Sequence, residues 1–190
     1  ESLQERLDSG NLPAKEIAKS KLANETEFPD GIPECGTDAL RFGLLAYTVQ
    51  GRDINLDVKR VVGYRMFCNK LWNATRFALQ FVDDFQPTST TLNDLMSSGK
   101  MATRDRHMIS RLMRGIETTE NFLAAYRFGD AQQAAYSLWI DDLCDVYLES
   151  IKPVVYDLSD ENKERRWAAQ ATLWVSLEEG LRLLHPMMPF

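Results

Sequence analysis

Two groups of polar residues in this sequence have the types and the spacing to do chemistry. The first is acidic: Asp141, Asp142 and Asp145 form a DDxxD string. Carboxylates at positions i, i+1 and i+4 of a helix can bind Mg²⁺ that holds a diphosphate, because Mg²⁺ prefers oxygen ligands. Enzymes that work in this way need a second metal-binding motif facing the first, and the sequence contains none. The competing interpretation is a solvated acidic face, because residues 141–161 hold seven acidic side chains against the single cation Lys152.

The second group consists of basic and amide side chains. It lies in residues 58–82, which contain five basic residues and no acidic one. At about 100° per residue, side chains spaced 4, 4, 3 and 4 positions apart fall on one side of a helix. Every member can donate hydrogen bonds and none is a carboxylate. We name this group the polar stripe: Arg65, Asn69, Asn73, Arg76 and Gln80.

The charge of this segment is opposite to that of the chain. With 22 basic and 28 acidic residues the chain has a net charge of −6, so the remainder carries −11 against +5 in 58–82. A basic helix on an acidic protein favours nucleic acid as a partner. The alternative is a solvated face whose compensating carboxylates lie on neighbouring helices. Tyr64 and Trp72 border the stripe, and an aromatic ring beside Arg and Asn is typical of sites that bind single-stranded bases.

Other residues that could react show no catalytic pattern. His107 and His185 are the only imidazoles, and neither has a sequence signature that links it to a nucleophile. No Gly-rich phosphate loop is present. The cysteines are Cys35, Cys68 and Cys144, an odd number without the spacing of metal ligands, which predicts reduced thiols in a cytosolic protein. We therefore expect no catalytic, cofactor-binding or metal-binding residue in this chain.

The elements that position these groups are all expected to be helices. Alternation of apolar and polar residues never extends beyond a few positions, and hairpin signals are absent. The predicted N-caps are Thr37 or Asp38, Asp57, Thr103 and Asp130. Long helices joined by short loops predict an all-α fold, an antiparallel helical bundle. The predicted helices are 14–23, 39–50, 58–82, 104–128, 131–152 and 160–185.

Burial can be predicted from the same helical wheel. The directions of helix 58–82 away from the polar stripe are apolar, so we expect protein to cover this helix on most sides. We also expect Trp139 and Trp174 in the core, where helices would pack on them. The apolar residues of helix 58–82 that would be covered are Val61, Met66, Phe67, Leu71, Trp72, Phe77, Leu79 and Val82.

Length and composition limit the class of protein. A chain of 190 residues, 44% hydrophobic and 26% charged, predicts one globular domain or one domain with an appendage. No apolar run approaches the ~20 residues that span a bilayer, so no membrane partner is expected. The charged start at Glu1 does not resemble a secretory signal. The missing initiator Met and the apolar ending suggest a piece of a longer protein.

Five motifs carry a resemblance to a known family. They are DALRF at 38–42, GRDINLD at 51–57, NKLWNA at 69–74, LCDVYLE at 143–149 and LHPMMPF at 184–190. With them, the chain resembles the valyl-tRNA synthetases of the eukaryotic cytosolic type over nearly its whole length. The related class I synthetases for isoleucine and leucine share the helical bundle, so the assignment to valine rests on the motifs in combination.

The resemblance implies a division of the chain and a role for each part. Residues 1–45 would be the connector, or stem-contact segment, that follows the catalytic core, and residues 46–190 the helical anticodon-binding domain. The parent enzyme would join valine to tRNA(Val) with ATP as cofactor, and would edit mischarged threonine in a separate domain. The HIGH and KMSKS signatures that bind ATP are missing here, so this fragment would itself be non-catalytic.

The resemblance also implies partners and a site. The partners would be tRNA(Val) and the catalytic and editing domains of the same chain, with no membrane and no DNA. The parent would be cytoplasmic, with a mitochondrial form as the alternative. The residues expected to bind tRNA are Arg65, Asn69, Trp72, Asn73, Arg76 and Gln80.

Two rival functions belong to other classes. In one, the chain is a helical protein–protein interaction module whose polar stripe meets an acidic partner. In the other, it is a Mg-dependent diphosphate enzyme that uses Asp141, Asp142 and Asp145. Selective binding of tRNA(Val) would separate the first rival from the anticodon-binding function, and loss of catalysis on mutation of Asp141 would favour the second.

Overall fold

The computed structural model describes residues 3–49, 56–82 and 92–190. The chain divides into two compact units, Glu1–Glu34 and Cys35–Phe190. Within the described residues the regular secondary structure is helical and no strand occurs, which confirms the prediction of an all-α fold. No helix in this part of the chain is long and apolar enough to cross a membrane.

The smaller unit is a pair of helices, α1 (Leu3–Asp8) and α2 (Ala14–Glu27). Pro13 directly precedes α2, where a proline removes no hydrogen bond that the helix would make. The Lys21 ammonium nitrogen lies 2.7 Å from a carboxylate oxygen of Asp8 and joins the two helices. No residue of α2 is buried, so this helix contributes no side chain to a core.

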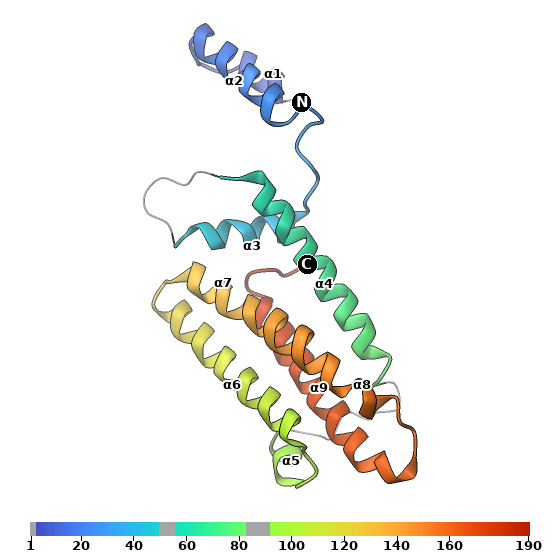
Figure 1. Ribbon diagram of the computed structural model, residues 1–190. Helices are drawn as coiled ribbons and strands as arrows, with labels where there is room; N and C mark the ends of the chain where they lie inside the picture. The colour runs from blue at the N-terminus through green and yellow to red at the C-terminus, as the bar shows by residue number, and fades with distance from the viewer. Residues whose placement is uncertain (1–2, 50–55, 83–91) are drawn as a thin grey trace. The chain divides into compact units, whose positions relative to one another are not determined.

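The larger unit is a helical bundle. In Figure 1, α4 and the continuous run from α7 to α8 point one way along the bundle, whereas α6 and α9 point the other way. This is the predicted antiparallel arrangement, and α3 packs against both α4 and α7. The elements are α3 (Thr37–Tyr47), α4 (Val58–Leu79), α5 (Leu92–Ser97), α6 (Thr103–Ala124), α7 (Phe128–Ser137), the π-helix η2 (Leu138–Leu148), α8 (Glu149–Val155), the 3₁₀-helix η3 (Asp160–Asn162) and α9 (Lys163–Leu184).

The core of the bundle contains two large aromatic residues of η2 whose polar atoms are paired. Trp139 is fully buried, and its indole N–H donates to the Gly180 carbonyl oxygen of α9 at 3.0 Å. The Tyr147 hydroxyl donates to an Asp105 carboxylate oxygen of α6 at 2.9 Å. Burial is the main reason that the pKa of the Tyr147 hydroxyl lies well above its ordinary value. These contacts fix η2 against both α6 and α9.

The predicted N-cap of α4 is confirmed, whereas the predicted N-cap of α3 is wrong. The Asp57 carboxylate accepts a hydrogen bond from the Lys59 backbone N–H at 2.9 Å, which confirms the predicted cap of α4. The prediction that Thr37 or Asp38 caps α3 is wrong, because Gly36 is the N-cap and both residues lie inside the helix. The glycine fits there because its φ of 85° is a conformation that side chains disfavour.

The ends of α6 and α7 also differ from the predictions. Thr103 is the first residue of α6 rather than its cap, which is Ala102. The Asp105 carboxylate accepts from the Ala102 backbone N–H at 2.8 Å, so an acid in the first turn does the capping. Asp130 lies inside α7, which begins at Phe128, and is not the predicted N-cap. The predicted α6 end near residue 128 is four residues too late, because α6 ends at Ala124.

The segment after α7 contains the largest departure from prediction. A helix was expected to end before Pro153, but α8 includes this residue and continues to Val155. Ile151 and Val155 are buried, and their packing stabilises the turn in which the proline removes one backbone hydrogen bond. Leu138–Leu148, which directly precede α8, form a π-helix. Apolar periodicity at 3.6 residues per turn does not reveal this conformation.

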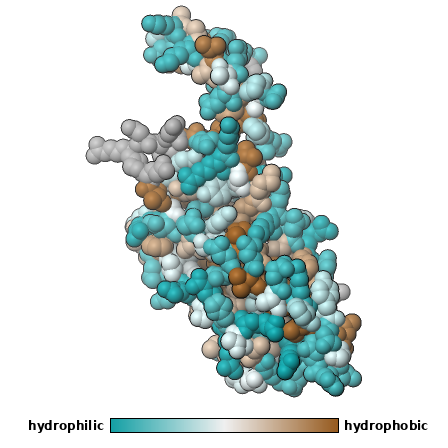
Figure 2. Space-filling view, in the orientation of Figure 1, coloured by the Kyte–Doolittle hydropathy of each residue, from teal (hydrophilic) through white to brown (hydrophobic). Residues whose placement is uncertain are grey.

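Side-chain burial confirms part of the prediction for the helices. Trp139 is in the core as expected, whereas Trp174 is only half-buried against it. The expectation that α4 is covered on most sides is wrong: Met66, Trp72 and Leu79 have exposed fractions of 61%, 67% and 48%. Figure 2 shows a mostly hydrophilic face on which hydrophobic residues form separate patches. Neighbouring helices cover only one side of α4, so a wide arc of it faces solvent.

Candidate nucleic-acid interface

Helix α4 is the element that presents the candidate site. Its start is fixed by the Asp57 cap, and its buried face is made of Val61, Phe67, Ala74 and Ala78. Phe67 stacks on Phe42 of α3, with ring centroids 5.2 Å apart. Since these side chains set the rotation of the helix, the opposite face must point to solvent. The polar stripe lies on that opposite face.

Every member of the polar stripe is exposed, as the sequence predicts. None of the five side chains makes a hydrogen bond or an ion pair with another residue in the part of the chain that the structure describes. The stripe therefore offers two guanidinium groups and three amide groups whose hydrogen-bonding capacity is available to a ligand. No contact with a described residue explains why these five positions of α4 carry polar side chains.

Two of the other three cations of α4, Lys70 and Arg60, contact neighbouring side chains. The Lys70 ammonium nitrogen lies 2.7 Å from a carboxylate oxygen of Asp145 on η2, and this hydrogen bond raises the pKa of Lys70. The Arg60 guanidinium lies over the Tyr47 ring, 4.8 Å from its centroid. The interpretation of the basic segment as a face neutralised by neighbouring helices thus holds for Lys70. It does not hold for Arg65 and Arg76.

The two aromatic residues that border the stripe in sequence have different surroundings. Tyr64 is half-buried in an aromatic cluster and meets Phe42 edge-on at 5.5 Å, so it stabilises the contact between α3 and α4. Trp72 is 67% exposed and lies one turn from Asn69 and Arg76 on the same side of the helix. Burial of a tryptophan normally stabilises a fold, and an exposed one beside polar donors is typical of an interface.

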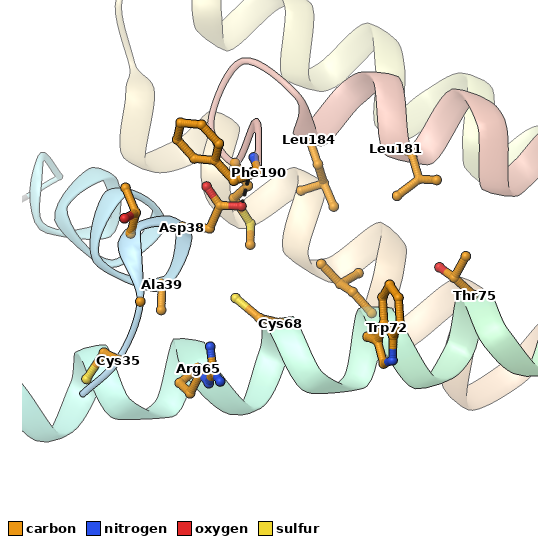
Figure 3. A pocket seen from close by; sticks show the side chains of 14 residues that line it. Cys35, Asp38, Ala39, Arg65, Cys68, Trp72, Thr75, Leu181, Leu184 and Phe190 are labelled. Atoms are coloured by element: carbon orange, nitrogen blue, oxygen red, sulfur yellow. Dashed lines mark hydrogen bonds between the residues drawn. The ribbon is translucent and has the colours of Figure 1, made fainter. Parts of the chain in front are cut away.

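A pocket of about 550 Å³ lies next to the stripe (Figure 3). Its walls come from the first turn of α3, one side of α4 and the last turn of α9 with the residues that follow. Arg65 and Trp72 belong both to this pocket and to the predicted site. On its α3 side, one Asp38 oxygen accepts from the Phe190 backbone N–H at 3.1 Å. The prediction treated Asp38 only as a cap, and no sequence signal placed it opposite α4.

The acidic string does not form a metal site in this structure. The Asp142 carboxylate accepts from the Arg111 guanidinium at 2.8 Å, and Asp145 pairs with Lys70. Asp141 is exposed on η2. No group of three or more possible metal ligands occurs among the described residues. Two of the three carboxylates, Asp142 and Asp145, are therefore ion-paired and join η2 to α6 and α4.

The remaining reactive side chains are two histidines and three cysteines. His107 and His185 are both exposed. The three cysteines are free, and Cys144 is buried, which raises the pKa of its thiol to about 11. Cys68 is half-buried in the wall of the pocket, where burial and then Asp38 raise the pKa of its thiol.

Comparison with known proteins gives a family match to the second half of the chain, outside α4, and relatives similar to the whole chain. Residues 105–190 match a family described as the anticodon-binding domain of tRNA ligase. The whole chain is also similar to the valine–tRNA ligase of Caenorhabditis elegans, at 48% identity over 188 residues, which is 99% of this chain and 17% of that protein.

Two further relatives show the same relation. The valine–tRNA ligase of Mus musculus is 48% identical over 191 residues, which is 100% of this chain and 15% of the mouse protein. The relative named valine–tRNA ligase, mitochondrial 1, from Arabidopsis thaliana is 47% identical over 191 residues, again 100% of this chain and 17% of the plant protein. The predicted resemblance is confirmed as far as valine–tRNA ligases in general, and the chain spans about one sixth of the length of these relatives. Similarity does not separate the cytosolic from the mitochondrial type.

Proposed function

We propose that this chain is the anticodon-binding region of a valine–tRNA ligase, and that the polar stripe together with Trp72 contacts the anticodon of tRNA(Val). The observation that carries the proposal is the state of α4: its stripe is exposed and has no hydrogen bond or ion pair with a described residue, and a 67% exposed tryptophan lies beside it. The match of residues 105–190 to the anticodon-binding domain supports an RNA partner.

The chemistry of the stripe suits an anticodon. A valine anticodon ends in adenine and cytosine at its second and third positions. An Asn amide can donate to and accept from an adenine edge at once, while Arg holds a phosphate or stacks on a base. Asn69 and Asn73 supply the amide, Arg65 and Arg76 the guanidinium, and Trp72 an exposed aromatic face. Bases in a loop are unstacked more easily than in a duplex, so a protruding helix face can reach them.

The parent enzyme would attach valine to tRNA(Val) with ATP, and these reactions would take place in other parts of it. In this scheme residues 1–45 are the connector to the catalytic core and residues 46–190 the anticodon-binding domain, with the catalytic and editing domains of the same chain as partners. The compact division after Glu34 separates the α1–α2 pair, while α3 packs with the bundle. The motif resemblance supports a cytoplasmic parent, with a mitochondrial form as the alternative.

Single substitutions on the stripe test the proposal. Asn69→Ala or Asn73→Ala should weaken binding of a tRNA(Val) transcript by ~1–3 kcal/mol and reduce the preference over a transcript with another anticodon. Arg76→Ala, if it removes a phosphate contact, should weaken both transcripts alike and lower the slope of log K against log salt by ~0.7. Affinities measured by filter binding at several salt concentrations would distinguish these two behaviours.

Matched controls lie on α6. Asn121 and Arg106 are exposed helical residues outside α4, so Asn121→Ala and Arg106→Ala should leave the preference between the transcripts unchanged. If Asn69→Ala, Asn73→Ala and Arg76→Ala all behave like these controls, the stripe is a solvated face and the anticodon is read elsewhere.

A further inference from the structure

A second pocket lies between α4 and α7, on the side of α4 away from the polar stripe. Its volume of about 350 Å³ lies at the lower end of the ~300–1,000 Å³ typical of ligand pockets. The residues that line it are Arg60, Gly63 and Tyr64 of α4 with Gln133 and Tyr136 of α7. At ~100° per residue the three α4 positions project opposite to the polar stripe, so this pocket and the stripe are separate sites.

Aromatic rings bridge α4 and α7 beside this pocket. The Tyr136 ring lies 4.8 Å from the Phe67 ring and 6.4 Å from the Tyr64 ring, measured between centroids. Phe67 is buried, whereas the two tyrosines are only half-buried. A half-buried tyrosine keeps its ring in the protein and its hydroxyl near water, so both hydroxyl groups belong at the pocket surface. Neither hydroxyl makes a hydrogen bond with a described residue.

Arg60 supplies a positive charge to the same pocket. Its guanidinium lies over the Tyr47 ring, 4.8 Å from the centroid, and it makes no hydrogen bond or ion pair with a described residue. Stacking of this kind holds the plane of the guanidinium but leaves its N–H groups available. The Gln133 amide nitrogen donates to the Ser137 hydroxyl oxygen at 3.3 Å, so a second N–H of this amide remains.

No carboxylate lines this pocket among the described residues. The acids one helical turn away are already engaged: Asp57 accepts from the Lys59 backbone N–H at 2.9 Å, and Asp130 pairs with Arg127 at 2.8 Å. The pocket therefore combines one cation with hydroxyl and amide donors, and no negative group opposes an anion there.

This set of donors fits a phosphate group. A phosphate ester presents several strong acceptor oxygens that point in different directions, and arginine forms charged hydrogen bonds with them. The guanidinium on one wall and the two tyrosine hydroxyls on another can approach different oxygens of one tetrahedral group. A carboxylate, which has only two oxygens in one plane, can use fewer of these donors. The tyrosine rings also offer surface to a small organic group attached to the phosphate.

We propose that the pocket between α4 and α7 binds a small phosphate monoester, whose oxygens accept hydrogen bonds from the Arg60 guanidinium and from the Tyr64 and Tyr136 hydroxyls. The proposal is independent of the anticodon contact, because the polar stripe lies on the opposite side of α4. A ligand held in this way would join α4 to α7 and stabilise the larger unit.

Phenyl phosphate is the probe, and isothermal titration calorimetry with the whole chain measures its binding. We expect saturable binding at one site, which Arg60→Ala weakens by about tenfold or more because a charged hydrogen bond is lost. Gly63→Leu should weaken binding as strongly. An added Cβ at Gly63 has nothing within 4 Å, and leucine favours a helix, so this variant fills the pocket without disturbing the fold.

Lys59→Ala is the matched control, since it removes the neighbouring cation of α4, which does not line the pocket. It should change the affinity by about twofold or less, because an exposed charge outside the site contributes little. Benzoate keeps the ring of the probe but replaces the phosphate by a carboxylate, and should bind about tenfold more weakly.

Three results would overturn the proposal. One is the absence of saturable binding of phenyl phosphate, and another is equal binding of benzoate. The third is an Arg60→Ala effect no larger than that of Lys59→Ala, with Gly63→Leu unaffected. If phenyl phosphate does not bind but an RNA hairpin binds more weakly to Arg60→Ala and Gly63→Leu than to Lys59→Ala, the pocket holds a backbone phosphate of RNA instead of a small ligand.

Discussion

Trp139 provides a quantitative test of how the bundle is held together. Its indole is fully buried between η2 and α9, with its N–H on the Gly180 carbonyl oxygen at 3.0 Å. A Cβ atom placed on Gly180 would lie 3.1 to 3.2 Å from atoms of the indole ring. The ring is thus packed directly on the α9 backbone, at a point where any larger residue than glycine would crowd it. We predict that Trp139→Ala removes much of the stability of the larger unit.

The expected magnitude follows from this packing. Replacing a buried tryptophan by alanine costs ~3–5 kcal/mol, because the cavity it leaves collapses only in part. Trp139→Phe keeps most of the ring volume and loses the hydrogen bond to Gly180, so its cost should be smaller, ~1–3 kcal/mol. Trp72→Ala is the matched control, since the same substitution at a 67% exposed position should change the free energy of unfolding by only about 0.5 kcal/mol.

Urea unfolding, monitored by circular dichroism, would measure these differences in the free energy of unfolding. The free energies are compared at a common m-value by linear extrapolation. A loss below about 1 kcal/mol for Trp139→Ala, or an equal loss for Trp72→Ala, would refute the assignment of buried and exposed helix faces.

Three further substitutions probe other parts of the fold. Burial raises the pKa of the Cys144 thiol to about 11, so the folded state favours the protonated form. The free energy of unfolding should therefore fall by up to ~1.4 kcal/mol per pH unit as the pH rises from about 9 to about 11, and urea titrations of Cys144→Ala should show a shallower fall. Gly63 lies inside α4 with open space around it. Gly63→Ala should therefore raise the free energy of unfolding by ~0.5–1 kcal/mol and raise the midpoint of thermal unfolding. A Cβ on Gly129 would clash with the Val49 side chain and lie 3.1 Å from the Leu45 carbonyl oxygen, so Gly129→Ala should destabilise the fold by ~1–3 kcal/mol and lower the same midpoint.

The parts of the fold that depend on local interactions could be predicted from the sequence. The Asp57 cap involves a backbone N–H two residues away, and the exposed stripe of α4 depends only on helical period. Pro153 shows the limit of local rules. A proline disfavours a helix, yet burial of Ile151 and Val155 against the rest of the bundle outweighs this cost.

The candidate site shows the same limit. Whether Trp72 is covered depends on which helices pack against α4, and helical period carries no information about that. The pocket joins Asp38 of α3 with Arg65 of α4 and Leu184 of α9, three residues that only the tertiary fold brings together. The π-helix η2 contacts α6 and α9, and the apolar period of the sequence does not distinguish it from an α-helix.

Discrimination between anticodons tests the central claim most directly. The chain would be titrated with a tRNA(Val) transcript and with the same transcript in which only the anticodon is exchanged, at fixed salt, so that the phosphate contacts are the same in both. If α4 reads the anticodon, the original transcript should bind about tenfold more tightly or better, since one good base contact contributes ~1–3 kcal/mol. Equal affinity for the two transcripts would contradict the claim.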